Sequence, residues 1–201
     1  MIGRLASAGL SINREKCKFG LSTVSFLGHS VSKDGISLLP SKVLAIADMP
    51  RPTMKVELQH FFGSTNFYHR FVPYLAKILA PLHSLTASCK TAKSPLAWES
   101  VHQDAFIAAK DALANAMMLS HPSSDPGMLV MLTMDASDVA VSTVLAQGAA
   151  HQPLGFYSKK LLSAEKKCSA CDKELLALYL SIRHFRHNLE GQPTLHGLDR
   201  P

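Results

Sequence analysis

The spacing of apolar residues changes along the chain, and the first change, near residue 40, is from a strand pattern to a helix pattern. Residues 23–27 alternate polar with apolar side chains, which is typical of a half-buried strand, and a second short apolar run occupies 36–38. Asp34 and Gly35 stand between the two runs, and an Asp-Gly pair favours a tight turn. The pattern therefore predicts a β-hairpin in the first part of the chain.

Apolar residues at three- and four-residue intervals predict helices over the next stretch, 41–90. Ser41 is placed to cap the first helix, and Pro50, with a second proline two residues later, ends it. Thr53 is placed to cap the second helix, and Pro81 is expected to bend the third.

Aromatic residues gather at the end of the second predicted helix, and a single tryptophan follows the polar linker at 86–94. We expect these rings in a core, and stacking on nucleic-acid bases is the alternative. The residues concerned are Phe61, Phe62, Phe67, Tyr68, Phe71 and Trp98.

The second half of the chain mixes helix and strand patterns. The predicted elements are a helix at 99–116, strands at 128–134, 139–147 and 154–158, a long helix at 170–189 and a short last strand at 194–198. Ser169 and Asp172 form a capping box at the start of the long helix, which we expect to be continuous. We expect the first three strands to form an antiparallel meander and the last strand to add parallel to the first.

Composition limits the class of protein. The chain has 201 residues, of which 47% are hydrophobic and 18% charged, and this is enough apolar material to exclude a disordered chain. The longest apolar runs are about six residues, too short for a membrane-spanning helix, and the N-terminus lacks a signal-peptide pattern. Four cysteines favour a reducing compartment, and a net charge of +6 favours polyanionic partners, nucleic acid first.

Two carboxylates are the candidates for catalysis or metal binding. Asp135 directly follows a hydrophobic strand, where an aspartate is either functional or a turn residue. Glu174 shares a helix face with Cys171, Leu178 and Phe185, so we expect it to face the core, where it needs a partner or a cation. The alternative is a favourable interaction with the helix dipole. A strand carboxylate and a helix carboxylate that converge would suit Mg²⁺, and two such ions can support cleavage of a phosphodiester.

A Cys-x-x-Cys pair and a His-x-x-His pair near the long helix nearly spell a zinc finger. The histidine gap is one residue short, and a helix pattern fills the space where a finger has a hairpin. Cys-x-x-Cys at a helix start is also typical of redox proteins, although no strand leads directly into this one. We therefore favour neither for Cys168, Cys171, His184 and His187.

Several short motifs follow one another along the chain. They lie at 5–20, at 26–29 (Phe-Leu-Gly-His), at 31–36, 40–43 and 50–52, at 58–71, 80–82 and 96–98, and at 135–137, 156–161, 165, 172–177 and 183–187. Together they resemble the reverse transcriptases of gypsy-type LTR retrotransposons, from the end of the polymerase palm to the start of the RNase H domain.

The resemblance implies an α+β fold in three parts. These are a palm-remnant hairpin with a primer grip at 1–40, a helical thumb and connection at 41–90, and an RNase H-like domain at 91–201 that is truncated at its C-terminus. It implies RNA-directed DNA polymerase and RNA–DNA hybrid endonuclease activity for the family. We expect this chain, as a fragment, to bind nucleic acid with little or no catalysis. The alternatives are a non-catalytic nucleic-acid- or protein-interaction module and a degenerate product without a selected function.

The resemblance also assigns the nuclease residues. Asp135 matches the first metal carboxylate of the RNase H domain and Glu174 the second. The third metal aspartate of the family falls on Leu198, with Asp199 one place late, and a slip of one residue in a strand turns a side chain to the other face. The fourth carboxylate and the Tyr-x-Asp-Asp motif of the polymerase are absent from the 201 residues, so no primer extension is expected.

The remaining expectations concern ligands and location. The cofactor implied is Mg²⁺ or Mn²⁺, weakly held, and the partners are an RNA–DNA hybrid or template–primer and the rest of the Pol polyprotein, with no membrane and no small-molecule cofactor. The location implied is intracellular, in the cytoplasm or nucleus, in virus-like particles. Lysines near the carboxylates would be a solvated rim or would touch phosphates. The residues expected to bind nucleic acid are Phe26, Leu27, Gly28, His29, Lys159 and Lys160.

Overall fold

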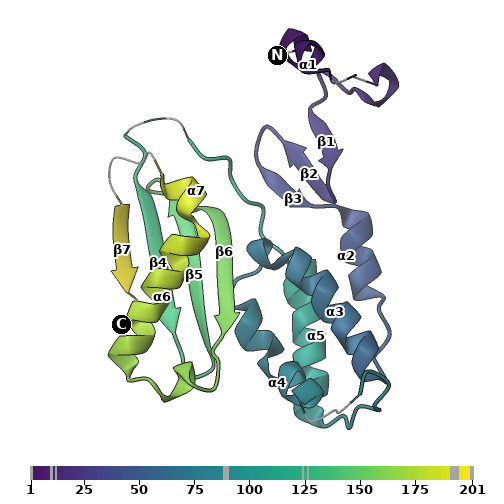
Figure 1. The fold of residues 1–201 in the computed structure, drawn as a ribbon, viewed down its shortest axis with the longest axis vertical. Helices are drawn as coiled ribbons and strands as arrows, with labels where there is room; N and C mark the ends of the chain where they lie inside the picture. Colours follow the sequence, from purple (N-terminus) through teal and green to yellow (C-terminus); the bar gives the residue numbers. More distant parts are fainter. Residues whose placement is uncertain are drawn as a thin grey trace.

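The computed structural model of the chain has a small sheet, a layer of helices and a larger sheet covered by a helix, which confirms the α+β class (Figure 1). No helix in the part of the chain that the structure describes is long and apolar enough to cross a membrane. The described residues are 2–9, 11, 13–87, 91–123, 125, 127–190 and 195–199, without the side chains of residues 2, 5, 6, 14 and 195–199.

The small sheet has three antiparallel strands in the order β1-β2-β3, where the sequence pattern predicted a two-stranded hairpin. The strands are β1 (Thr23–Phe26), β2 (His29–Ser32) and β3 (Ile36–Leu38). The middle strand was missed because only Leu27 and Gly28 separate it from β1. Both have a positive φ, 46° and 82°, as a two-residue hairpin turn requires.

The N-terminal segment extends beyond β1, away from the rest of the molecule (Figure 1). It contains α1 (Ile2–Ser7) and the short 3₁₀ helix η1 (Arg14–Lys16).

The helical layer follows the small sheet. Its elements are α2 (Pro40–Ala47), α3 (Lys55–Phe67), the 3₁₀ helix η2 (His69–Phe71), α4 (Leu75–Ala87) and α5 (Ser100–Ala114). The prediction of Ser41 as an N-cap is wrong, because Pro40 occupies the first turn and Leu39 the cap, as is common for proline. Pro81 lies inside α4.

The start of α3 depends on Glu57 more than on a capping hydroxyl. Its carboxylate accepts hydrogen bonds from the backbone N–H of Thr53, at 2.7 Å, and of Met54, at 3.2 Å, and from the Thr53 hydroxyl. These bonds favour the charged form and hold the pKa of Glu57 below its ordinary value. Thr53 thus supports the helix, but Met54 is the N-cap residue.

The aromatic residues mostly form the core of the helical layer, as predicted. Phe61 and Phe71 are buried, and the Phe61 ring packs against Phe106 at 4.8 Å between centroids. The Trp98 indole N–H donates to the carbonyl of Pro52 at 2.7 Å. Phe67 is the exception, because 54% of it is exposed.

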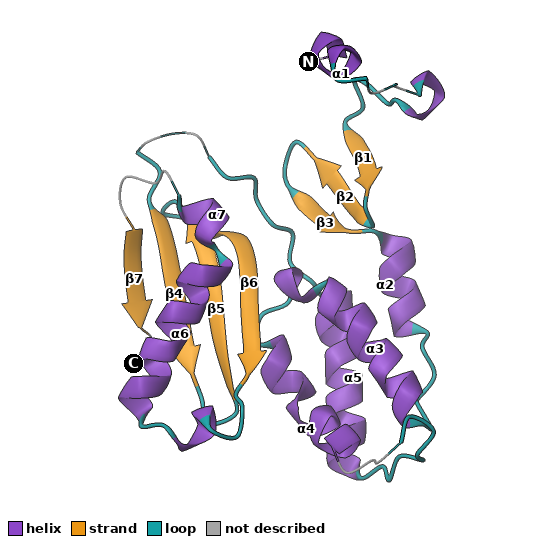
Figure 2. Ribbon diagram, viewed as in Figure 1, coloured by secondary structure: helices purple, strands orange, loops and turns teal. Residues whose placement is uncertain are grey.

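The larger sheet has the strand order β6-β5-β4-β7 (Figure 2). Its strands are β4 (Val130–Ala136), β5 (Ala140–Gln147), β6 (Gln152–Lys160) and β7 (Leu195–Asp199). The first three pair antiparallel as a meander, and β7 pairs parallel with β4. Both features were predicted from the sequence.

The two faces of this sheet have different neighbours. Val144 and Phe156, which are paired across β5 and β6, pack into the core of the helical layer. On the same face, Ser158 accepts a hydrogen bond from the backbone N–H of Ala76 in α4, at 2.9 Å. The residues between them along the strands point to the other face, which α6 (Ala170–His184) covers.

The start of α6 is the predicted capping box. The Ser169 hydroxyl oxygen accepts the backbone N–H of Asp172, and the Asp172 carboxylate accepts the backbone N–H and the hydroxyl of Ser169. The prediction of one continuous helix over 170–189 is wrong, because Phe185 separates α6 from α7 (Arg186–Leu189). The Phe185 ring is buried against the sheet beside Gly155, where a methyl group on residue 155 would lie 3.1 Å from the ring.

We expect Gly35→Ala to destabilise the protein by about 2 kcal/mol or more. Gly35 has a φ of 154°, and an added methyl group would overlap the carbonyl oxygen of Leu119. That carbonyl accepts a hydrogen bond from Ile36 at 2.8 Å, which joins β3 to the segment after α5.

Urea unfolding provides the measurement, and Gly63→Ala in α3 is the control. An added methyl group at Gly63 meets no atom within 4 Å, so this change should stabilise the helix by up to about 1 kcal/mol. Equal effects of the two substitutions would contradict the packing described for Gly35.

Candidate functional site

Asp135 lies near the end of β4 on the face of the sheet that meets the helical layer. It pairs with Ser142 of β5 and shares its face with Thr133. Together with Pro73 and Tyr74, which precede α4, these residues line a cavity of about 10 Å³, room for about one water molecule. Asp135 is half-buried where the sheet meets the residues that precede α4.

The residue opposite Asp135 has an unusual backbone. Tyr74 has a φ of 56°, in the left-handed region that non-glycine residues seldom adopt. Its carbonyl nevertheless accepts the first hydrogen bonds of α4, from Lys77 and Ile78. Strained residues of this kind gather at functional sites, and this one borders the predicted nuclease carboxylate.

Glu174 does not face the core, as the sequence pattern suggested. The buried row of α6 is Lys173, Ala177 and Ser181, one residue out of step with the prediction, and Glu174 is exposed. The small side chains let the helix approach the sheet closely, and the hydroxyls of Ser181 and Thr143 share a hydrogen bond across the contact.

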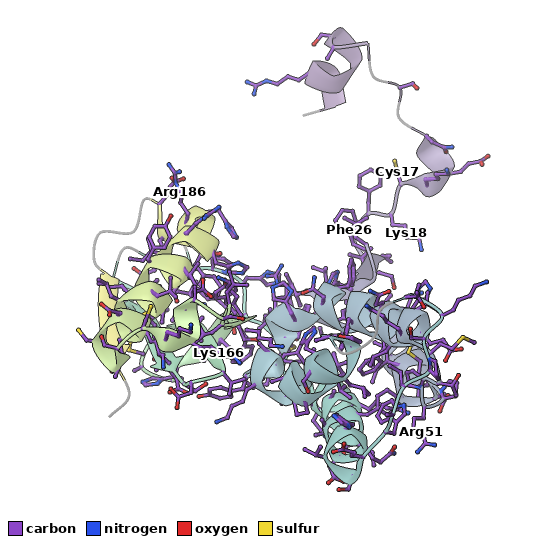
Figure 3. The ribbon with its side chains drawn as sticks, turned by 60° about the horizontal axis from the view of Figure 1, so that its bottom comes forward. Cys17, Lys18, Phe26, Arg51, Lys166 and Arg186 are labelled. Carbon is purple, nitrogen blue, oxygen red and sulfur yellow. The ribbon has the colours of Figure 1, made fainter. Side chains whose placement is uncertain are left out.

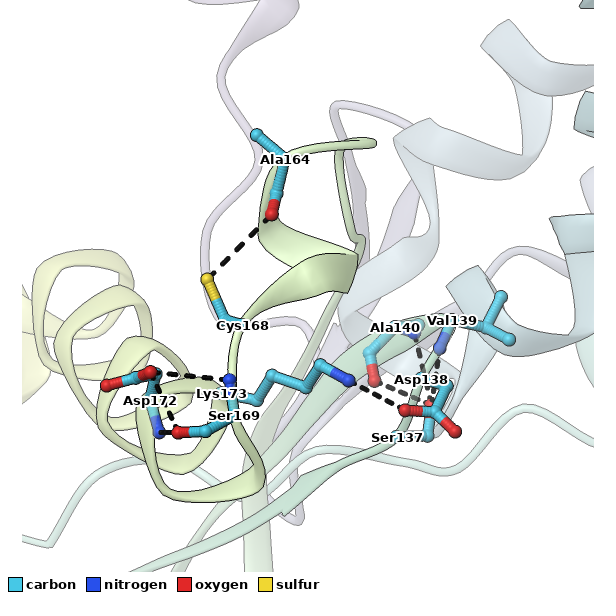
Figure 4. A network of polar contacts seen from close by, with 9 residues as sticks. All are labelled: Ser137, Asp138, Val139, Ala140, Ala164, Cys168, Ser169, Asp172 and Lys173. Atoms are coloured by element: carbon cyan, nitrogen blue, oxygen red, sulfur yellow. Dashed lines mark hydrogen bonds and ion pairs between the residues drawn. The ribbon is translucent and has the colours of Figure 1, made fainter.

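Lys173 instead joins the start of α6 to the turn between β4 and β5 (Figure 4). Its ammonium group lies 2.7 Å from a carboxylate oxygen of Asp138, although the lysine side chain is 10% exposed and the aspartate 93%. The hydrogen bond from Lys173, and then its charge, hold the pKa of Asp138 below the ordinary value. Ser137 closes the same turn, because its oxygen accepts from Val139 and Ala140. Ser137 therefore forms the hydrogen bonds of the turn, and Asp138 links the turn to Lys173. Asp135 lies before the turn, inside β4.

Asp135 and Glu174 lie at the same end of the sheet but belong to opposite sides of it. Lys173, the neighbour of Glu174, contacts Asp138, three residues after Asp135. Asp135 points to the helical layer, whereas α6 packs on the other face. Among the described residues, no three His, Cys, Asp or Glu side chains are grouped as a metal site requires. The residues that the structure describes therefore do not by themselves fit a two-metal centre.

The register of β7 bears on the third metal ligand of the family. Position 198 pairs with Thr133 and position 199 with Met134. Position 198 is therefore in the same row of the sheet as Thr133 and Asp135, and position 199 is in the alternate row. The alignment of the family's third metal aspartate with Leu198 stays a prediction.

The zinc-finger arrangement does not occur. Cys168 precedes α6 and Cys171 is in its first turn, both exposed, whereas His184 is the last residue of this 15-residue helix. A rise of about 1.5 Å per residue puts Cys171 and His184 roughly 20 Å apart, so they cannot share one ion.

The predicted primer-grip residues divide into two groups. Phe26 and Leu27 are 62% and 74% exposed at the β1–β2 turn. His29 packs behind the turn, with its ring stacked on Phe67 and on Phe71 at 5.4 and 5.2 Å between centroids, and its Nε2 is buried without a hydrogen-bond partner. His29 therefore holds the turn in place, and the two residues before Gly28 are the accessible ones.

A concave surface of about 690 Å³ lies beside this turn. It is lined by Leu27 and Gly28 of the turn, by Lys42 of α2, by Phe67 of α3 and by Tyr68. The sequence did not indicate Lys42, because an exposed lysine on a helix carries no distinguishing pattern.

The two lysines at the end of β6 also differ. Lys159 forms an ion pair with Glu165 at 2.8 Å, so its charge is already compensated. Partial burial, and then the charge of Lys166, lower the pKa of Lys160, and the charge of Lys160 in turn helps to lower the pKa of His83. Lys160 is therefore the lysine of the two that has no ion-pair partner among the described residues.

Known proteins resemble this chain in sequence and in fold. Residues 98–195 match the family model of the RNase H-like domain found in reverse transcriptase. The transposon Tf2-3 and Tf2-4 polyproteins of Schizosaccharomyces pombe are each 33% identical over 194 residues, 95% of this chain and 14% of each polyprotein. Residues 98–195 therefore belong to the family of RNase H-like domains found in reverse transcriptase.

Solved structures of the foamy viral protease-reverse transcriptase have the same fold as this chain. One is in complex with ds DNA, with a TM-score of 0.76 and 24% identity over 88% of this chain and 30% of the viral one. Another, in complex with RNA/DNA hybrid, has the same TM-score and identity over 89% of this chain and 24% of its own.

A further group of side chains escaped the sequence reasoning. His69 and Arg70 of η2 meet His184 and His187 in a pocket between the helical layer and the RNase H-like domain. The His-x-x-His motif pointed to half of this group, but nothing in the sequence connected it to residues more than one hundred positions earlier.

We expect Asp138→Asn to lower the melting temperature at neutral pH, because it leaves the buried Lys173 ammonium without its counter-charge. The folded-state pKa of Asp138 is lowered, so the contribution of the pair is complete above the unfolded pKa of about 3.9 and is lost as the pH falls through the folded pKa. The difference between the variant and the parent should therefore disappear in acid.

Thermal unfolding between neutral and acidic pH provides the measurement. The control is Asp104→Asn on α5, an exposed carboxylate outside the ion pairs found among the described residues. A loss for Asp138→Asn that is the same at every pH would show that the ion pair is not its cause.

Proposed function

We propose that this chain is a nucleic-acid-binding part of a retrotransposon Pol protein, which holds an RNA–DNA hybrid or template–primer duplex with little or no catalysis of its own. The observation that carries the proposal is the β1–β2 turn, which presents two large apolar side chains to solvent beside a concave surface that a lysine also lines. The relatives support it, because they are polyproteins of a transposon and reverse transcriptases solved with ds DNA or RNA/DNA hybrid.

The turn is built to keep its side chains exposed. Leu27 has a left-handed φ of 46°, which costs conformational energy in a residue other than glycine. The ring of His29 packs on Phe67 and Phe71, and Gly28 lies against Phe67, so the turn is fixed to the end of α3 while Phe26 and Leu27 stay exposed. Apolar side chains held out of the core at such a cost are typical of a binding surface.

Charge supports a polyanionic ligand. The chain has a net charge of +6, and Lys18 stands on the same projecting part of the molecule as Phe26 (Figure 3). Lys42 lines the concave surface and is exposed. A phosphate backbone would gain from these charges regardless of base sequence, and exposed rings and aliphatic groups would contact sugars and bases.

The nuclease assignment is part of the same proposal. Members of the RNase H-like family generally use divalent metals, and we assign Asp135 and Glu174 as the ligands this chain contributes to weakly held Mg²⁺ or Mn²⁺. With Leu198 at the third position, an ion would keep most of its water ligands and bind poorly. We further propose that the protein acts inside the cell, in the cytoplasm or nucleus, together with other parts of the Pol polyprotein in virus-like particles.

Lys42→Gln should weaken binding of a short RNA–DNA hybrid severalfold at low salt and reduce the slope of log affinity against log salt by about one. Lys33→Gln is the matched control, since Lys33 is an equally exposed lysine at the β2–β3 turn, outside the concave surface. Fluorescence anisotropy at several salt concentrations provides the measurement. The proposed surface is wrong if both variants lose affinity equally or if the parent chain binds no better than a neutral protein.

The parent chain should cleave the RNA strand of a hybrid only at trace level with Mg²⁺ or Mn²⁺, because its ligand set is incomplete. Leu198→Asp should raise the affinity for Mn²⁺, since position 198 shares a row with Asp135, whereas Asp199→Asn should leave it unchanged. Isothermal titration with Mn²⁺ and a gel assay of cleavage provide the measurements. Robust cleavage by the parent chain, abolished by Asp135→Asn and by Glu174→Gln, would instead show that the site is complete enough to work.

A further inference from the structure

A pocket of about 210 Å³ separates η2 of the helical layer from the end of α6 and the start of α7. His69 and Arg70 line it from η2, and His184, His187 and Asn188 line it from the other side. The volume is more than ten times the roughly 10–15 Å³ that a cavity needs to hold one water molecule. A small polyatomic ligand therefore fits between the two parts of the protein.

Every charged or titratable side chain that lines this pocket is cationic or becomes so on protonation. The nearby acid on α7's C-terminal side, Glu190, is occupied by Arg186 at 2.6 Å and does not line the pocket. Arg70 has its guanidinium over the Phe71 ring and no carboxylate partner among the described residues. A concave site with several donors for an anion and no acid is complementary to an anion.

The hydrogen bonds fix where the donors point. Nδ1 of His69 lies 2.6 Å from the carbonyl oxygen of Asn66, which can only accept, so Nδ1 carries a proton and Nε2 is the atom left for a ligand. The His184 ring stacks on Tyr157 of β6 at 4.3 Å between centroids and meets the His69 ring edge-on at 5.8 Å. These contacts hold both rings in place before a ligand arrives, which lowers the entropy lost on binding.

The groups around His184 disfavour its charged form while the pocket holds no anion. Burial, and then the positive surroundings of His69, His187 and Arg70, lower the pKa of His184 to about 4. From β6 it faces Tyr157, whose pKa burial raises, with smaller opposing effects from Arg183 and Glu165, so the phenol is uncharged at neutral pH. Glu165 is itself paired with Lys159.

We propose that this pocket binds one phosphoryl group, held by the guanidinium of Arg70 and by the ring N–H groups of His69, His184 and His187. The group is either a backbone phosphate of nucleic acid or a free phosphate ion, since both present the same oxygens. Binding takes up a proton at His184, because an adjacent anion stabilises the charged form of that ring. For a phosphodiester, whose charge is constant in this range, affinity therefore rises as the pH falls from about 7.5 toward 5.5.

Nuclear magnetic resonance of the histidine rings tests this on the whole chain. Inorganic phosphate is titrated at several pH values, with chloride keeping the ionic strength constant. We expect saturable shifts of His69, His184 and His187, and a pKa of His184 that rises toward its ordinary value of about 6.5 when phosphate is bound. Shifts that never saturate, or a His184 pKa that phosphate leaves unchanged, would overturn the proposal.

Arg70→Gln should weaken phosphate binding at least about tenfold, because it removes the permanent charge and a two-pronged donor. Arg186→Gln is the matched control, since Arg186 is a neighbouring exposed arginine that pairs with Glu190 outside the pocket, and it should change affinity less than about twofold. His187→Gln removes an exposed ring and should weaken binding severalfold even if Arg70→Gln fails to fold. Equal losses in the arginine variants would contradict a built site.

Competition identifies the source of the phosphoryl group. If a backbone phosphate occupies the pocket, a short RNA–DNA hybrid reverses the shifts that inorganic phosphate causes; if the ion is free phosphate, the hybrid leaves them in place. Either result supports the pocket. Hybrid binding that depends on Lys42, in a chain without phosphate-induced shifts, would overturn the pocket and leave the proposed function intact.

Discussion

The four-stranded sheet is covered on both faces, and the two-residue alternation of its strands assigns each side chain of β4, β5 and β6 to one cover or the other. Val144 and Phe156 go to the helical layer, and Thr143 goes to α6. This constraint decides the geometry of the candidate nuclease site. Asp135 faces the helical layer, as Val144 and Phe156 do, whereas Glu174 stands on α6, which covers the other face. The two carboxylates can therefore cooperate only around the end of the sheet.

The contact between α6 and the sheet shows why the helix sits where it does. Ala177 and Ser181 permit a close approach that bulkier residues would prevent, and the price is a buried lysine one turn earlier. Lys173 is tolerated there because Asp138 supplies a charge at 2.7 Å. The pair also places the ammonium group of Lys173 at the turn after β4, the strand that carries Asp135. Any divalent ion bound by Asp135 or Glu174 would have to coexist with that ammonium group, which further disfavours tight binding.

The sequence pattern predicted the order of the elements well, because strand and helix periods differ and most elements here have a clear buried side. It failed where a single residue decided the outcome. The turn at Leu27 and Gly28 is too short to separate two strands by pattern, and the break at Phe185, whose ring is buried beside Gly155, leaves no mark in the spacing of apolar residues. The prediction that Glu174 faces the core was wrong because Lys173 counts as a polar residue in the pattern. The burial of Lys173 depends on its pairing with Asp138, a contact 35 residues away.

The histidine at the C-terminal end of α6 has a pKa that the helix dipole does not explain. The dipole of a helix favours positive charge at its C-terminus and would raise the pKa of a histidine there. His184 is the last residue of α6, yet its pKa is lowered to about 4. Burial and the neighbouring cations therefore outweigh the dipole. Together they disfavour the charged form of the His184 ring. Because His69 and Arg70 come from the helical layer, the groups that disfavour the charged form of His184 act across the junction with the RNase H-like domain. An anion between them would offset this effect, so occupancy of the pocket and the packing of the two parts would be thermodynamically linked.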